Sequence, residues 1–197
     1  TVEILHKLGH SVDQLDLINL DDPIQCARKA VDLVREGNAD CVMKGKLETG
    51  VLMKELLAIR GSRTMSAFGL FQTDHYHKVF GVTDMGLLIA PTLGQKKDMI
   101  CNAVGALHAL GVSNPKVAVV AAVEKPNPKM LETMDAGALA QMAAAGQIPG
   151  CIVEGPISVD LAMDPQAAEI KGYTSPVAGD ADLLIMPNIA GGTSRQS

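Results

Sequence analysis

The chain has 197 residues, of which 47% are hydrophobic and 20% are charged, and its net charge is −5. This composition excludes a disordered chain, and the negative charge argues against a duplex-DNA binder, which would neutralise phosphates with excess Lys and Arg. No apolar run reaches the ~18 residues of a membrane span, and residues 1–10 mix charged with apolar side chains, unlike a signal peptide.

The first predicted helix covers residues 24–36, where apolar residues recur at helical spacing. Asp22 is a favourable N-cap for it, and Pro23 suits the first helical position. A short strand is predicted at 39–43, and a second helix at 49–60.

Strands and helices alternate along the rest of the chain. The three extended runs between residues 64 and 90 have no helix between them, so they predict an antiparallel excursion. The alternation of strands and helices after them predicts an α/β fold with a largely parallel sheet. Ligands of such sheets bind at the carboxyl ends of strands, so candidate site residues should follow strands. The expected elements are extended runs at 64–72, 78–83 and 87–90, helices at 95–110, 127–145 and 164–171, and strands at 116–123, 150–154 and 181–186.

The loop after the first predicted strand could bind an anion. Lys44, Gly45 and Lys46 come just before Thr49, at a helix N-terminus where free N–H groups and the helix dipole favour negative charge. The loop lacks the spacing of a Walker motif. A connecting loop with solvated lysines is the alternative interpretation.

Other loops also follow predicted strands. Gly155 and Pro156 re-aim the chain and place Asp160 at the mouth of the expected cleft, while the glycines in 187–192 would let a phosphate approach closely. Asp84 ends another predicted strand. Ordinary turn chemistry remains an alternative for each of these loops.

Metal and cofactor signals are weak. His75 and His77 form an H-x-H pair, for which surface histidines are favoured over a metal site. The four cysteines have no zinc spacing and predict free, buried thiols in a reducing cytoplasm. The sequence also lacks G-x-G-x-x-G, so dinucleotide binding loses its main support.

Taken in order, several motifs resemble those of the phosphate acetyl/butyryltransferase family, and most closely its phosphate butyryltransferase branch. The resemblance runs over residues 23–189. The motifs lie at 39–45, 76–78, 82–84, 127–129, 154–156, Asp160, 171–172, 175–182 and 187–189.

The resemblance implies an isocitrate-dehydrogenase-like α/β fold of two domains, with an interdomain cleft. The first domain would comprise residues 1–63 and 193–197, and the second would comprise 64–192. It also implies a cytoplasmic enzyme that interconverts acyl-CoA plus phosphate with acyl phosphate plus coenzyme A. We therefore expect a homodimer or higher oligomer, no tightly bound cofactor, and no nucleic-acid or membrane partner.

The resemblance also implies residue roles. Lys54 falls in the register of a basic residue that faces phosphate, and Thr49 matches a hydroxyl residue of the same loop. Near the end of the chain, Arg195 would clamp phosphate and Ser194 would donate a hydrogen bond to the developing oxyanion. The expected substrate-binding residues are Lys44, Gly45, Thr49, Lys54, Asp84, Gly155, Pro156, Asp160 and Asn188.

The sequence departs from the family where Gly192 adjoins Thr193, because family members carry a helix and a strand there. We therefore expect the sequence to be a piece of a longer protein. Two other functions stay open: a non-catalytic acyl-CoA-sensing domain, and a metal-dependent hydroxy-acid dehydrogenase. The latter needs a cluster of aspartates, of which Asp84 and Asp160 are candidates without a third ligand.

Overall fold

The computed structural model describes residues 2–59 and 64–188. The chain divides into two compact units, Thr1–Gly61 and Ser62–Ser197, which we describe separately as unit 1 and unit 2. Residues 193–197, expected from the sequence to join the first domain, lie outside the described residues.

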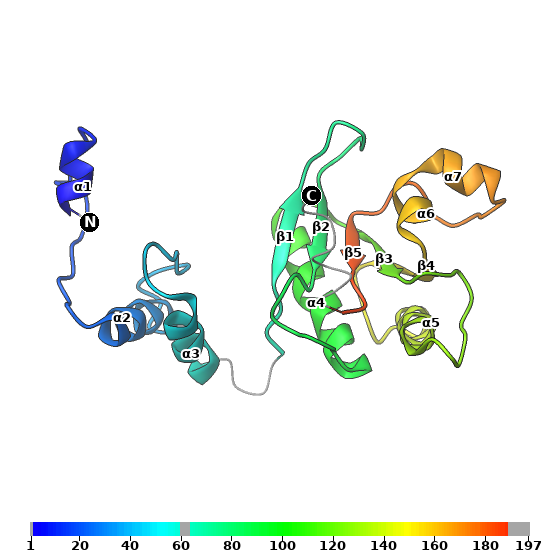
Figure 1. Ribbon diagram of the computed structural model, residues 1–197, viewed down its shortest axis with the longest axis horizontal. Helices are drawn as coiled ribbons and strands as arrows, with labels where there is room; N and C mark the ends of the chain where they lie inside the picture. The colour runs from blue at the N-terminus through cyan, green and yellow to red at the C-terminus, as the bar shows by residue number, and fades with distance from the viewer. Residues whose placement is uncertain (1, 60–63, 189–197) are drawn as a thin grey trace. The chain divides into compact units, whose positions relative to one another are not determined.

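In the described part of unit 1 the regular elements are helices, with α1 at Val2–Lys7, α2 at Pro23–Arg35 and α3 at Thr49–Ile59 (Figure 1). The predicted start of α2 is confirmed, because the Asp22 side chain accepts a hydrogen bond from the backbone N–H of Ile24 at 3.1 Å.

The core of unit 1 is small and joins α2 to α3. It consists of the buried side chains of Ala27, Val31 and Leu52. The strand predicted at 39–43 is wrong: these residues form no strand, and Met43 is 91% exposed. Since residues 2–59 contain no other strand, a segment there has no partner for ladder hydrogen bonds.

Unit 2 is built on a mixed sheet with the strand order β1-β2-β5-β3-β4. β1 and β2 are antiparallel, whereas β2–β5, β5–β3 and β3–β4 are parallel, which confirms the expected antiparallel excursion on a largely parallel sheet. Residues 87–90 are bends instead of the expected extended run. The strands are β1 Phe68–Phe71, β2 Phe80–Thr83, β3 Lys116–Val120, β4 Ile152–Ile157 and β5 Leu183–Ile185.

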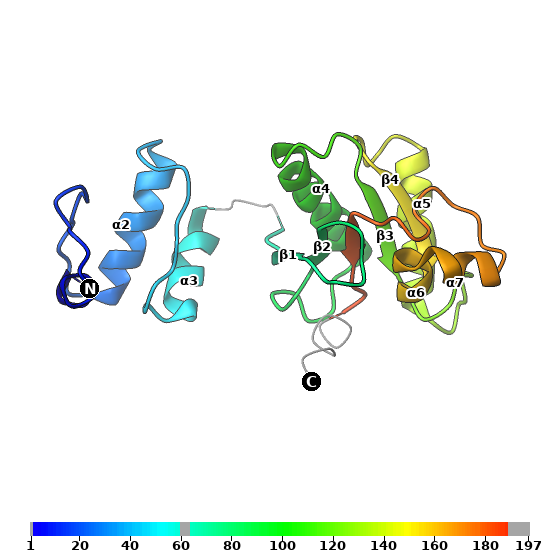
Figure 2. The same ribbon diagram turned by 90° about the horizontal axis from the view of Figure 1, so that it is seen from above.

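Helices cover both faces of this sheet (Figures 1 and 2). The long helices α4 (Leu93–Ala109) and α5 (Leu131–Ala144) pack on one face, and the short α6 (Val159–Met163) and α7 (Pro165–Ile170) on the other. The connections from β2 through α4 to β3 and from β3 through α5 to β4 run across the sheet in one direction, whereas the connection from β4 through α6 and α7 to β5 runs back. Because both kinds of crossover are right-handed, α4 and α5 must lie on one face of the sheet and α6 and α7 on the other.

The alternation of side chains along β3 feeds two hydrophobic cores. Val117 and Val119 join the core under α4 and α5, whereas Ala118 and Val120 join the core under α6 and α7. This two-sided burial explains the near-continuous apolar run of the strand. No described helix has both the length and the apolar composition needed to cross a bilayer.

Two of the differences from the sequence-based boundaries bear on the candidate site. The helix expected from residue 127 begins at Leu131, because the Asn127 carbonyl and the Lys129 N–H are used in a turn closed by Asn127 Oδ1 and by the Thr133 hydroxyl. Gly155 and Pro156 lie inside β4 instead of in a loop after it.

Candidate functional site

The carboxyl ends of the four parallel strands of unit 2 meet at one edge of the sheet. Thr83 of β2 pairs with Ile185 of β5, Ile185 lies level with Val119 of β3, and Val120 pairs with Ile157 of β4. We call the residues just beyond these ends, 84–88, 121–124, 158–160 and 186–188, the carboxyl edge. Three candidate residues, Asp84, Asp160 and Asn188, therefore share it.

Asp84 is held by the backbone around it. Its side chain is buried, and its carboxylate accepts hydrogen bonds from the N–H groups of Gly86, Leu87 and Leu88 at 2.8–3.0 Å and from that of Ala67 at 3.3 Å. These contacts favour the structural turn that the sequence left open for this residue. Asp84 shapes the edge by fixing the loop after β2.

Gly155 and Pro156 bring β4 close to β3. A Cβ atom on Gly155 would lie 2.8 Å from Val119 Cβ and 3.1 Å from the Val119 carbonyl oxygen, so only glycine fits there without displacement. Pro156 is buried beside it. These two residues thus position the chain that leads directly to Asp160.

Asp160 belongs to a cluster of polar side chains drawn from three segments. Lys171 Nζ lies 3.0 Å from Asp160 Oδ2 and 3.4 Å from Glu124 Oε1, and the Ser158 hydroxyl donates to Glu124 Oε1 at 2.7 Å. The Asp160 side chain is 52% exposed, so it remains accessible to a ligand. We call Glu124, Ser158, Asp160 and Lys171 the Lys171 cluster.

The charges in this cluster favour ionised carboxylates. Hydrogen bonds from Ser158 and Lys171 lower the pKa of Asp160 to about 2, and the same donors lower the pKa of Glu124. The Ser158 hydroxyl has a single proton, and its 2.7 Å distance to Glu124 Oε1 shows that it donates a hydrogen bond to that carboxylate. Both the Ser158 hydroxyl and the Lys171 ammonium group thus contribute to the depressed pKa of Asp160.

A second charged cluster lies at the opposite edge, where β2, β3 and β5 begin. Lys78 Nζ lies 2.7 Å from both Asp180 Oδ1 and Asp182 Oδ1, and Lys116 also pairs with Asp180. His77 Nε2 lies 2.8 Å from Asp180 Oδ1. His77 therefore has a carboxylate partner that ties it to the strand beginnings. Within residues 2–59 and 64–188, no three His, Cys, Asp or Glu side chains form a group that could hold a metal ion.

The candidate residues of unit 1 are exposed. Lys44 Nζ donates to the carbonyl oxygens of Gly45 and Leu47 at 3.2 and 3.0 Å, so its ammonium group stabilises its own loop. Thr49 is the first residue of α3 and is exposed. Lys44, Gly45 and Thr49 therefore all lie near the N-terminus of that helix.

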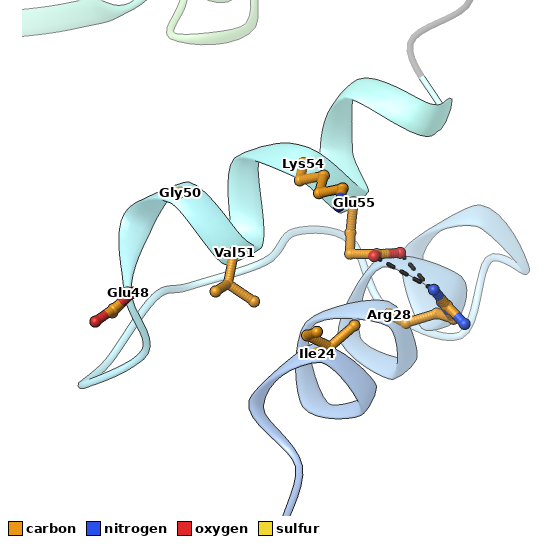
Figure 3. Close-up of a pocket in the computed structure, with 7 residues that line it drawn as sticks. All are labelled: Ile24, Arg28, Glu48, Gly50, Val51, Lys54 and Glu55. Carbon is orange, nitrogen blue, oxygen red and sulfur yellow. Dashed lines mark hydrogen bonds and ion pairs between the residues drawn. The ribbon is translucent and has the colours of Figure 1, made fainter.

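Lys54 lines a shallow hollow of about 470 Å³ between α2 and α3 (Figure 3). On one side of the hollow, Arg28 Nε pairs with Glu55 Oε2 at 3.2 Å. Lys54 itself has no ion-pair partner among the described residues. The other lining residues are Ile24, Glu48, Gly50 and Val51.

The expected site and the described site differ in two ways. Ser194 and Arg195 lie outside the described residues. Sequence reasoning assigned no role to Glu124 or Ser158, and Lys171 entered it only as part of the motif at 171–172. Glu124 could have been found by the rule that polar residues after a buried strand belong to the carboxyl edge, but Lys171 follows a helix and carries no such signal.

Comparisons with known proteins place the chain in one family. A model described as phosphate acetyl/butaryl transferase matches residues 9–195. The phosphate butyryltransferase of Clostridium acetobutylicum is 41% identical over 97% of this chain and 65% of its own length. The phosphate acetyltransferase of Thermotoga maritima is 44% identical over 85% of this chain and 58% of its own length. The chain thus spans less than two thirds of these curated relatives.

A solved structure agrees with these matches. A branched-chain phosphotransacylase from Enterococcus faecalis V583 superposes with a TM-score of 0.75 at 29% identity, covering 98% of this chain and 76% of that one. The expected family resemblance is confirmed by matches along nearly the whole chain. The chain belongs to the phosphate acetyl/butaryl transferase family.

Proposed function

We propose that the protein carrying this chain is a phosphate acyltransferase of the butyryl or acetyl type. It interconverts acyl-CoA and phosphate with acyl phosphate and coenzyme A. The observation that carries the proposal is the family match over residues 9–195, which includes every candidate site residue named from the sequence. The relatives with the names phosphate butyryltransferase and phosphate acetyltransferase support the same reaction class.

The chemistry needs a site that tolerates two anionic reactants. A phosphate oxygen attacks the carbonyl carbon of acyl-CoA, the carbonyl electrons move onto oxygen, and collapse of this oxyanion breaks the C–S bond and releases the thiolate. Cationic groups offset the repulsion between phosphate and the developing oxyanion. We assign phosphate to Lys54 and Arg195, and the oxyanion to Ser194.

The remaining candidates shape the cleft and hold coenzyme A. Thr49, Lys44 and Gly45 form the loop at the N-terminus of α3, while Gly155, Pro156, Asp160, Asp84 and Asn188 belong to unit 2. We propose that the two units form an isocitrate-dehydrogenase-like arrangement with the substrates in the interdomain cleft. Lys44, Thr49 and Lys54 are all exposed on unit 1, which supports a role for that unit at the anionic substrates.

The proposal also covers the cofactor requirement, the oligomeric state and the cellular location of the enzyme. We propose that it needs no tightly bound cofactor, because the reaction transfers an acyl group between two nucleophiles without redox chemistry. We also propose a homodimer or higher oligomer in the cytoplasm. These statements extend the resemblance of this chain to its relatives.

Thiol release tests the proposed reaction. The intact protein that carries this chain is incubated with phosphate and acetyl-, butyryl- or branched acyl-CoA, and the free thiol and the acyl phosphate are measured together. Phosphate-dependent release of both products in equal amounts is expected. Binding of acyl-CoA without acyl phosphate would instead support a non-catalytic acyl-CoA-sensing domain and contradict the proposed activity.

A further inference from the structure

We propose that Lys171 is a positioning residue that fixes the Asp160 carboxylate for coenzyme A. The inference rests on the proposed function and deepens it, because it assigns a part of the substrate to the Lys171 cluster. Lys171 is the residue that follows α7, and its ammonium group bridges Glu124 from the β3 loop and Asp160 from α6. One side chain thereby links three segments at the carboxyl edge.

The backbone at Lys171 is fixed by the segment that follows it. The Tyr173 hydroxyl donates to Glu154 Oε1 at 2.9 Å, and the Ser175 hydroxyl donates to Glu154 Oε2 at 2.8 Å. Glu154 lies in β4, so residues 171–175 are anchored to the strand that also carries Gly155 and Pro156. Lys171 is therefore held beside Asp160 by the sheet and does not reach it from a free loop.

The local charge restricts what Asp160 can bind. Glu124 and Asp160 are both acceptors when ionised, and a pair of carboxylates repels phosphate. Lys171 compensates one of the two charges through Asp160 Oδ2, and the Asp160 side chain is 52% exposed, so the carboxylate stays accessible to a ligand donor. The amide N–H and hydroxyl groups of the pantetheine arm of coenzyme A are donors of this kind, and inorganic phosphate at neutral pH is a poor match.

The test compares Lys171→Met with Lys125→Met. Lys125 is exposed, follows Glu124 in the sequence and has no ion-pair partner among the described residues, so it controls for the loss of one positive charge at the same edge. Lys171→Met should raise the dissociation constant of coenzyme A, measured by calorimetry, by on the order of tenfold. It should raise KM for acyl-CoA to a similar degree and leave KM for phosphate unchanged. Lys125→Met should change neither.

Two further variants separate positioning from a general loss of structure. Lys171→Arg keeps the charge and a donor, and should restore coenzyme A binding to within about threefold of the unmodified chain. The double variant Lys171→Met with Asp160→Asn should bind no more weakly than Asp160→Asn alone, because Lys171 acts through Asp160.

The outcomes distinguish this inference from the proposed function. Equal dissociation constants for the unmodified chain and Lys171→Met, or additive losses in the double variant, overturn the role of Lys171 whatever the turnover. A chain that shows no detectable coenzyme A binding also overturns it. A chain that binds coenzyme A through Lys171 but forms no acyl phosphate overturns the proposed activity alone.

Discussion

Individual aspartates of unit 2 have different tasks, and their donors distinguish them. Asp84 is buried and accepts hydrogen bonds from four backbone N–H groups, whereas Asp160 is half exposed with one cationic partner. Asp180 lies at the opposite edge and joins two lysines and a histidine. The same residue type thus fixes a loop, faces the candidate site, or ties strand beginnings together.

The ion pairs of Asp180 predict a pH-dependent contribution to stability. Burial alone would raise its pKa, but hydrogen bonds from Lys116, Lys78 and His77 outweigh burial and hold the pKa well below its ordinary value. Because the folded-state pKa is depressed, the stabilisation is present above the ordinary Asp pKa of about 3.9 and is lost as the pH falls below it. Asp180→Asn should lower the free energy of unfolding by about 1–2 kcal/mol at pH 7.

Urea unfolding at pH 7 and at pH 3 measures this effect. Asp74→Asn is the matched control, since Asp74 is exposed and has no hydrogen-bond or ion-pair partner among the described residues. The difference in unfolding free energy between the two variants should narrow at the lower pH. A difference that stays constant or widens would show that Asp180 does not stabilise the fold as an ionised group.

At the scale of elements, the contact of β4 with β3 depends on Gly155. A methyl group there would press on the Cβ and carbonyl oxygen of Val119, both below 3.2 Å, and the backbone atom cannot move independently of its strand. Gly155→Ala should therefore destabilise unit 2 by about 1–3 kcal/mol.

A substitution at Gly105 should have the opposite effect on the stability of unit 2. It is exposed in the middle of α4, and a Cβ there meets nothing within 4 Å. Gly105→Ala should stabilise by about 0.5–1 kcal/mol through helix propensity. Thermal unfolding of the two variants beside the unmodified chain measures the expected loss of stability in Gly155→Ala and the expected gain in Gly105→Ala. Equal stability of all three would contradict the close approach of β4 to β3.

The sequence predicted elements well where local signals agreed with burial. The apolar run of β3 and the Asp22-Pro23 start of α2 were sufficient for correct placement. The segment 39–43 was misassigned because a strand depends on a partner that a local pattern does not supply. Gly155 and Pro156 were interpreted as a turn because local chemistry cannot show that glycine there serves a close approach of two strands.

The candidate site was predictable only in part for a related reason. Asp160 follows a predicted strand, so the carboxyl-edge rule found it. Its partner Lys171 also contacts Glu124, which lies 47 residues away in the sequence, because the chain returns over the second face of the sheet. Such pairing is a consequence of topology and is not visible in spacing.

For the whole molecule, we propose complementary tasks for two units of unequal construction. Unit 2 has a sheet with a hydrophobic core on each face, whereas the described core of unit 1 consists of three buried residues. Cationic Lys54 lies on unit 1, and the acceptor Asp160 lies on unit 2. The central claim is that phosphate depends on the former and coenzyme A on the latter in one reaction.

The most direct test is the dependence of thiol release from butyryl-CoA on phosphate concentration for the unmodified chain, Lys54→Met and Lys29→Met. Lys29 is an exposed residue of α2 without an ion-pair partner among the described residues, and it controls for the loss of charge on unit 1. Lys54→Met should raise KM for phosphate by about tenfold, with KM for butyryl-CoA unchanged. A phosphate KM equal to that of Lys29→Met, or an equal rise in both KM values, would contradict the account.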